Sequence, residues 1–137
     1  PRYLLLTNKT INMRTSLNAL HHQSNDWLRD LEFYKDDVAV QVKRLEEVAS
    51  SNTSKDLLAK VEHFQNKFIM LREQIDTLTN DVNARNHEVT EISKTRPEHV
   101  TEKFNATASG LHKRMKDFTH VLADTRFEFN NFLGEVM

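Results

Sequence analysis

Apolar residues recur along this chain at alternating spacings of three and four, a repeat that puts one stripe of side chains on one face of an α-helix. The first stripe consists of Met13, Leu17, Leu20, Ser24, Trp27, Leu31, Tyr34, Val38, Gln41, Leu45 and Val48. The second consists of Leu57, Val61, Phe64, Phe68, Leu71, Ile75, Leu78, Val82, Arg85, Val89 and Ile92. The third consists of Thr101, Phe104, Ala108, Leu111, Met115, Phe118, Leu122, Thr125, Phe129, Phe132 and Val136. A β-strand would scatter each stripe over both faces, so the pattern predicts three helices.

Two short polar segments separate the stripes. Residues 49–54 form a cluster of small polar side chains, in which Thr53 or Ser54 can cap a helix and Asp56 can favour its first turn. Residues 95–98 contain the internal Pro97, which suits the first turn of a helix. We therefore expect helices over about residues 10–50, 54–94 and 97–136, within a single helical domain of residues 1–137. Because short connections make successive helices antiparallel, the predicted fold is all-α, an elongated antiparallel three-helix bundle with heptad, coiled-coil-like packing.

Counting outward from the two predicted turns sets the register of the stripes. Trp27 then falls level with Leu78 and Met115, and large side chains fall beside small or polar ones, as dense packing requires. The same register brings opposite charges together in four pairs: Lys67 with Glu128, Lys60 with Glu135, Asp81 with Arg114, and Asp37 with Arg126. Each pair contributes only about 0–1 kcal/mol, but together they favour this arrangement of the helices over its mirror topology.

Several apolar residues have no place in this core. Tyr3 and Leu6 continue the first stripe beyond the ends of the other two helices, and Phe33, Val40 and Phe127 lie away from the main seam. One interpretation is a frayed tail with isolated surface apolar residues, which are common in folded proteins. The other is a contact surface formed by Tyr3, Leu6, Phe33 and Val40, which a homodimer or another protein would cover.

Composition excludes several classes of function. Nineteen Lys and Arg against twenty Asp and Glu leave a formal charge of −1, so the basic surface of a nucleic-acid binder is absent. The chain has no cysteine, which excludes disulfides and thiolate chemistry and suits a cytoplasmic location. The apolar run at residues 3–6 is too short for an export signal or a membrane span, so we expect no membrane insertion.

Seven histidines invite comparison with metal-binding bundles of the hemerythrin-like or ferritin-like type. Those bundles need histidines and carboxylates on core positions, with pairs such as Glu-x-x-His. That pair does not occur in the chain, and the heptad places His21 and His112 beside the seam and the other histidines outward. We therefore predict no metal ligand and no cofactor.

Signatures of catalysis are missing as well. The sequence has no glycine-rich phosphate loop and no nucleophile elbow, so we expect no enzymatic activity and no catalytic residue. The polar seam residues Arg85, Gln41 and Ser24 are expected to fix the register of the helices, at some expense of stability.

Two runs carry a resemblance to other proteins. The segments WLRDLEFYKDD at residues 27–37 and VEHFQNKF at residues 61–68 resemble stretches of uncharacterised bacterial helical proteins, and this resemblance implies no activity. In outline the predicted bundle is similar to spectrin-type three-helix repeats, by architecture alone. We predict a structural or protein–protein interaction module, self-associating or bound to another protein. The alternative is a metal-binding or small-ligand-binding bundle.

Overall fold

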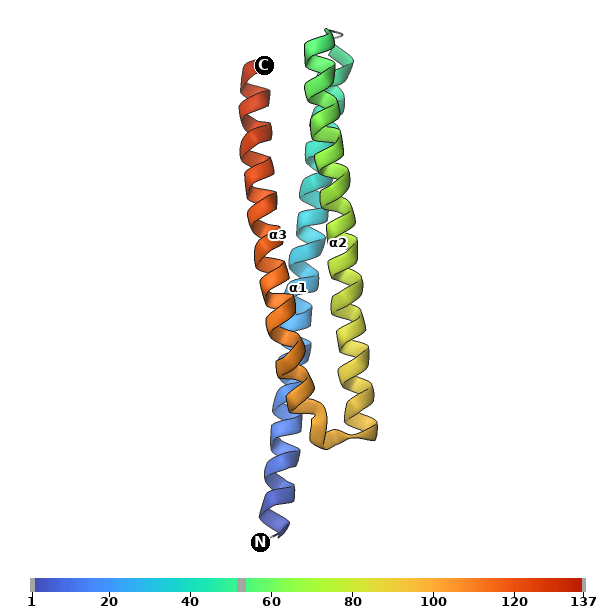
Figure 1. The fold of residues 1–137 in the computed structure, drawn as a ribbon, viewed down its shortest axis with the longest axis vertical. Coiled ribbons are helices and arrows are strands. Elements are labelled where there is room, and N and C mark those ends of the chain that lie inside the picture. Colours follow the sequence, from blue (N-terminus) through green and yellow to red (C-terminus); the bar gives the residue numbers. More distant parts are fainter. Residues whose placement is uncertain (1, 52–53, 137) are drawn as a thin grey trace. The chain divides into compact units, whose positions relative to one another are not determined.

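The protein is all-α, with three long helices packed against one another in the computed structural model (Figure 1). The structure describes residues 2–51 and 54–136, and the side chains of residues 8, 10–51 and 54–136. Helix α1 spans Arg2–Ser51, α2 spans Lys55–Thr95 and α3 spans Val100–Val136, with the short 3₁₀ helix η1 at Pro97–His99. No strand occurs in the described ranges. The predicted fold class is confirmed.

The helix boundaries follow the predicted signals with two differences. Ser54 caps α2, since the Leu57 backbone N–H donates to Ser54 Oγ at 3.3 Å, while Thr53 lies outside the described residues. Helix α1 begins at Arg2 rather than near residue 10, because no glycine or proline interrupts residues 2–9. Pro97 starts the 3₁₀ turn rather than α3 itself, and Arg96 before it has the non-helical φ of −140° that a following proline favours.

Two compact units divide the chain, and each contains a segment of all three helices. Unit 1 comprises Pro1–Asp30 and Leu78–Met115, and unit 2 comprises Leu31–Thr77 and Lys116–Met137. The single domain over residues 1–137 stays a prediction. The two units are described separately below.

The core of unit 1 is aliphatic where the chain turns from α2 into α3. Leu20, Val89 and Val100 are fully buried there, and four half-buried residues pack around them: Met13, Leu17, Ile92 and Phe104. Val100 takes the buried position that the stripe assigned to Thr101, which is half-buried. The 3₁₀ turn accounts for the shift, since its three residues per turn change the phase of the stripe at the start of α3.

The core of unit 2 is aromatic. Phe129 lies 5.2 Å from Phe64 and 5.1 Å from Phe68, measured between ring centroids, and Phe132 lies 5.1 Å from Phe64. Such edge and tilted contacts stabilise beyond the burial of area. Of the remaining stripe residues in unit 2, Tyr34 is half-buried, Val136 has 38 % of its surface exposed, and the others are buried.

The four predicted ion pairs are all present. In unit 2, Lys67 lies 3.0 Å from Glu128, Lys60 lies 3.3 Å from Glu135, and Arg126 lies 3.4 Å from Asp37. In unit 1, Arg114 lies 2.6 Å from Asp81. A second pair in unit 1 joins Glu88 to Lys103 at 2.6 Å. In both units the residue number on α3 falls as the number on α2 rises, so the two helices are antiparallel within each unit. The register counted from the turns is therefore confirmed at these positions.

Candidate interaction surface and its cleft

Two of the four residues predicted to form a contact surface are exposed on α1 in unit 2. Phe33 has 65 % of its surface exposed and Val40 has 51 %. Tyr3 and Leu6 lie within α1, but their side chains lie outside the described ones. The structure therefore shows that Phe33 and Val40 are exposed, and the contact surface itself stays a prediction.

Phe33 and Val40 lie on the side of α1 that is turned toward α3. At about 100° per residue, Phe33, Val40 and Asp37 fall within about 60° of one another around the helix. Asp37 pairs with Arg126 of α3 at 3.4 Å, which fixes the direction of this side. The ring of Phe33 also meets Tyr34 edge-on, with centroids 6.1 Å apart. The exposed stripe thus lies on the α1 side nearer to α3, and it leads toward the groove between these two helices at the end of unit 2.

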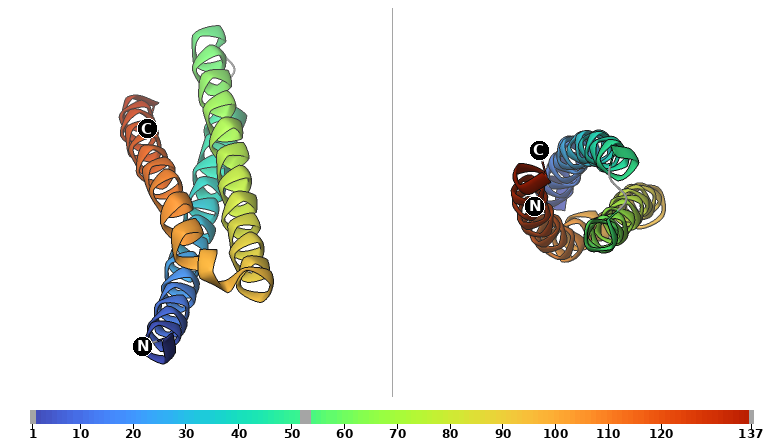
Figure 2. Two further views of the ribbon diagram at one scale, coloured as in Figure 1. Left: turned by 60° about the horizontal axis from the view of Figure 1, so that its bottom comes forward. Right: turned by 90° about the horizontal axis from the view of Figure 1, so that it is seen from above.

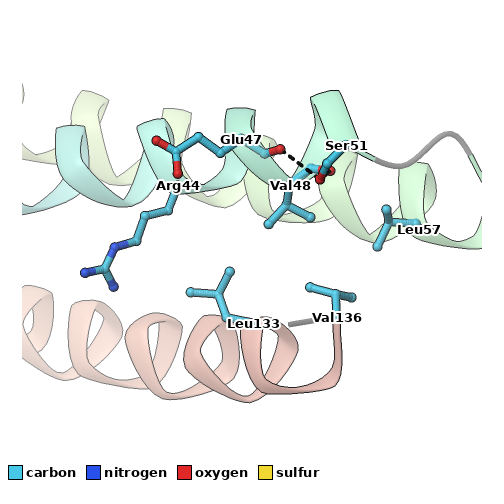
Figure 3. A pocket seen from close by; sticks show the side chains of 7 residues that line it. All are labelled: Arg44, Glu47, Val48, Ser51, Leu57, Leu133 and Val136. Carbon is cyan, nitrogen blue, oxygen red and sulfur yellow. Dashed lines mark hydrogen bonds between the residues drawn. The ribbon is translucent and has the colours of Figure 1, made fainter.

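The groove opens into a cleft at the end of unit 2. The cleft has a volume of about 570 Å³, and Figure 3 shows its lining residues: Arg44, Glu47, Val48, Ser51, Leu57, Leu133 and Val136. In Figure 1 and in the left view of Figure 2 the last turns of α3 stand apart from α1. Its depth is apolar and its α1 edge is polar.

Side-chain volumes explain why the cleft forms here. The rings of Phe129 and Phe132 on α3 pack against Phe64 on α2, and they fill the space between these two helices. The next layer toward the helix ends carries the shorter aliphatic side chains Val48, Leu57 and Val136. Of these, Val48 and Val136 point into the space between α1 and α3 (Figure 3). Short side chains behind a bulky layer leave space between helices that the bulky layer holds apart.

Arg44 is the charged group at the edge of the cleft. Its guanidinium extends toward α3, whereas the carboxylate of Glu47 lies back along α1 (Figure 3). No ion pair or hydrogen bond of Arg44 is found with the described residues. Ser51 is occupied, since its hydroxyl donates to the Glu47 backbone oxygen at 3.1 Å. The cleft therefore joins apolar walls to a cation without a protein counter-ion among the described side chains.

Two acceptors that lie one and two turns before Arg44 on α1 are also left without hydrogen bonds. Asp37 Oδ2 and Gln41 Oε1 are buried, and within the described part of the chain neither has a hydrogen-bond partner. Asp37 keeps the electrostatic attraction of Arg126 at 3.4 Å. The α1 side of unit 2 thus leaves more buried polar atoms without hydrogen bonds than a closed bundle core does.

A smaller groove runs on the other side of α3, facing α2. It has a volume of about 250 Å³ and is lined by Lys60, His63, Phe64, Glu128, Asn131, Phe132 and Glu135. Both carboxylate oxygens of Glu128 are occupied there, by His63 Nε2 at 2.8 Å and by Lys67 Nζ at 3.0 Å. These hydrogen bonds, from His63 first and Lys67 second, lower the pKa of Glu128. A carboxylate held in this way belongs to the packing of α2 on α3.

The histidines do not gather into a metal site. All seven are exposed, and the described residues contain no group of three or more His, Cys, Asp or Glu side chains able to hold a metal ion. Sequence reasoning placed His63 outward, and its contact with Glu128 was not anticipated.

Arg85 is buried in unit 1, as predicted, with 3 % of its surface exposed. Its guanidinium donates to Thr107 Oγ1 at 2.8 Å, Gln23 Oε1 at 2.6 Å and the Phe104 backbone oxygen at 3.2 Å. It also lies 5.5 Å from the Trp27 ring and 4.9 Å from the Phe104 ring, the geometry of cation–π contacts. Burial lowers the pKa of Arg85. These hydrogen-bond and ring partners are all neutral, and they hold the guanidinium between the three helix segments of unit 1.

Comparison with protein family models, curated proteins and solved structures finds no match to this chain. Within the described residues, no helix carries an apolar stretch long enough to cross a membrane. The resemblance drawn from residues 27–37 and 61–68 therefore stands only at the level of architecture: the chain is an all-α three-helix bundle.

Proposed function

We propose that the protein is a non-enzymatic protein-interaction module that binds through the α1 face of unit 2 at Phe33 and Val40. The observation that carries this proposal is the exposure of 65 % and 51 % at two apolar residues seven positions apart on one helix. Full burial of an apolar side chain of this size contributes about 1.5–3 kcal/mol. Two such side chains at heptad spacing form the start of a helix-binding seam.

Nothing inside unit 2 requires these residues to be apolar. Phe33 touches Tyr34 at its edge, and it otherwise faces outward from α1. An exposed apolar stripe of this kind, beside an open groove, is typical of a protein–protein contact. A second copy of the chain and a different protein are both occupants that the proposal allows.

The test replaces the stripe by charge. We expect the double variant Phe33→Glu, Val40→Lys to fold normally but to lose binding, because burying unpaired charge in an interface is unfavourable. The matched control is Ile69→Glu, Met70→Lys, which makes the same change at exposed apolar residues on α2 of unit 2. Light scattering at high micromolar concentration reports self-association. Photo-crosslinking in the host from a benzophenone amino acid at position 40, against one at position 70, reports other partners. A monomeric wild type without crosslinks specific to position 40 would contradict the proposal.

A further inference from the structure

We infer that the partner is an amphipathic helix of a different protein, which lies along the α1–α3 groove of unit 2 and sets a carboxylate against Arg44. This inference rests on the proposed function and names the partner of the same face. It is drawn from the continuity of the exposed stripe with the cleft, the apolar cleft walls and the charge of Arg44.

The stripe and the cleft form one continuous edge. At about 100° per residue, Val40, Arg44 and Glu47 fall within about 60° of one another around α1, and Phe33 lies within the same arc. Arg44 and Glu47 line the cleft, so the exposed stripe leads directly into it. From residue 33 to residue 47 this edge is about 21 Å long at a rise of 1.5 Å per residue. A straight edge of four helical turns matches another helix better than a small ligand or a loop.

The cleft walls suit apolar side chains entering from above. Val48 of α1 and Leu57 of α2 lie across the cleft from Leu133 and Val136 of α3 (Figure 3). A docked helix would lie beside the bundle as a fourth helix. One of its apolar side chains would enter this space and contact side chains of α1 and α3. Val40 and Phe33 would then cover the next two turns of the same docked face.

Charge selects the partner's polar residue. Arg44 has no counter-ion among the described side chains and extends across the mouth of the cleft. A docked helix would partly remove it from water, and a Glu or Asp at that level would accept hydrogen bonds from its guanidinium. A Lys at the same level would face Arg44 with like charge. The docked helix is therefore apolar toward the cleft and acidic beside it.

The charges around the stripe disfavour a second copy. An antiparallel pairing that sets Phe33 of one chain against Val40 of the other brings the exposed Arg44 of one copy opposite the exposed Arg29 of its mate. A parallel pairing sets Asp36 against itself. Like charges placed directly opposite one another oppose association, so a helix of different sequence fits the stripe better.

The probes are three fluorescently labelled 21-residue peptides with one shared Leu and Ile heptad seam. They differ at a single flanking position, which holds Glu, Gln or Lys. Fluorescence anisotropy measures their dissociation constants for the full chain. We expect the Glu peptide to bind about ten-fold more tightly than the Lys peptide, as one well-placed charged pair allows. The variant Arg44→Glu should reverse this preference, whereas the control Arg72→Glu on α2 should keep it.

Each remaining outcome has a defined meaning. Loss of peptide binding in the Phe33→Glu, Val40→Lys variant and in Val136→Asp supports the groove as the site, with circular dichroism confirming that each variant is folded. Peptides that bind equally well to those variants lie elsewhere and overturn the inference. A preference for the Glu peptide that Arg44→Glu leaves unchanged also overturns the inference. The absence of binding by any peptide at 200 μM overturns it too, since that concentration corresponds to a binding free energy of about 5 kcal/mol. Crosslinks at position 40 without peptide binding would leave the proposed function standing and remove only the helix.

Discussion

The two units solve the same packing problem with different residues. Unit 1 places polar groups inside its core, at Ser16, Ser24 and Arg85, and satisfies each of them with hydrogen bonds. Unit 2 buries five phenylalanines in its core and leaves Gln41 Oε1 without a hydrogen-bond partner among the described atoms. Unit 2 also carries most of the large exposed apolar side chains described: Phe33, Val40, Leu58, Ile69, Met70, Val121, Phe127 and Val136. In unit 1, Ile11 is the described side chain of this kind.

This contrast suggests that unit 1 is suited to fixing the register of the helices and unit 2 to binding a partner. Buried polar groups accept few alternative alignments, because each misplaced one loses its hydrogen bonds, so unit 1 is suited to fixing the register. Aromatic packing tolerates more alternatives, and exposed apolar residues offer area to a partner, so unit 2 is suited to association. The predictions below test this difference, beginning with the largest effect.

The aromatic core of unit 2 should respond most strongly to truncation. Phe129 is fully buried between Phe64, Phe68 and Phe132, so Phe129→Ala should destabilise the protein by about 3–5 kcal/mol. Chemical denaturation followed by circular dichroism measures this change. The control is Phe127→Ala, two positions away with 71 % of its surface exposed, which should stay within about 0.5 kcal/mol. Equal effects of the two variants would show that the aromatic cluster does not form.

The polar core of unit 1 should give a smaller and more selective response. Arg85→Leu removes a buried charge, and the groups that it leaves have other partners, since Thr107 also donates to Lys103 O at 2.9 Å and Gln23 is only half-buried. We expect a change within about 1 kcal/mol in either direction. Arg85→Ala should be worse, by about 2 kcal/mol or more, because it also opens a cavity beside Trp27. Comparable losses for the two variants would mean that the hydrogen bonds of Arg85, rather than its volume, hold unit 1 together.

The smallest effect concerns acid. Because the folded state lowers the pKa of Glu128, its contribution to stability is present above the unfolded value of about 4.3 and is lost as the pH falls through the lower folded value. Glu128→Gln should therefore flatten the fall in melting temperature below pH 4.3, about the pKa of an unperturbed glutamate. The effect should be small, since the Glu128 side chain is 45 % exposed. The control is Glu62→Gln at an exposed position. If Glu62→Gln changed the fall of melting temperature with pH to the same extent, the effect could not be assigned to Glu128.

The sequence alone predicted the register well, for a physical reason. Heptad spacing shows which side of a helix is buried, and the two polar turns give the points from which residues are counted. Pairs such as Lys60 with Glu135 then follow from their equal distances from the turns. The exposure of Phe33 and Val40 follows from the same count. Val100 was missed because the 3₁₀ turn at Pro97–His99 changes the phase, and spacing alone does not reveal a change of helix type.

The cleft and the surroundings of Arg85 were beyond such counting. The cleft depends on the volumes of Phe129 and Phe132 relative to Val48 and Val136, which set a separation between helices rather than a pattern along one. The contact of Arg85 with Gln23 depends on the rotamers of two long side chains. A small polar residue beside the seam, such as Thr107, was the available signal for an arginine partner.

The pairs between α2 and α3 also have a kinetic consequence. The sequence separation is 33 residues for Asp81 with Arg114, 61 for Lys67 with Glu128 and 75 for Lys60 with Glu135. Closing a shorter loop loses less entropy, so contacts between α2 and α3 should form first near the proline turn and then extend toward the other ends of the helices. Truncations near that turn, such as Val89→Ala, should then slow folding, while Val61→Ala should mainly speed unfolding. Stopped-flow measurements that found the opposite would place the nucleus at the far end of the hairpin.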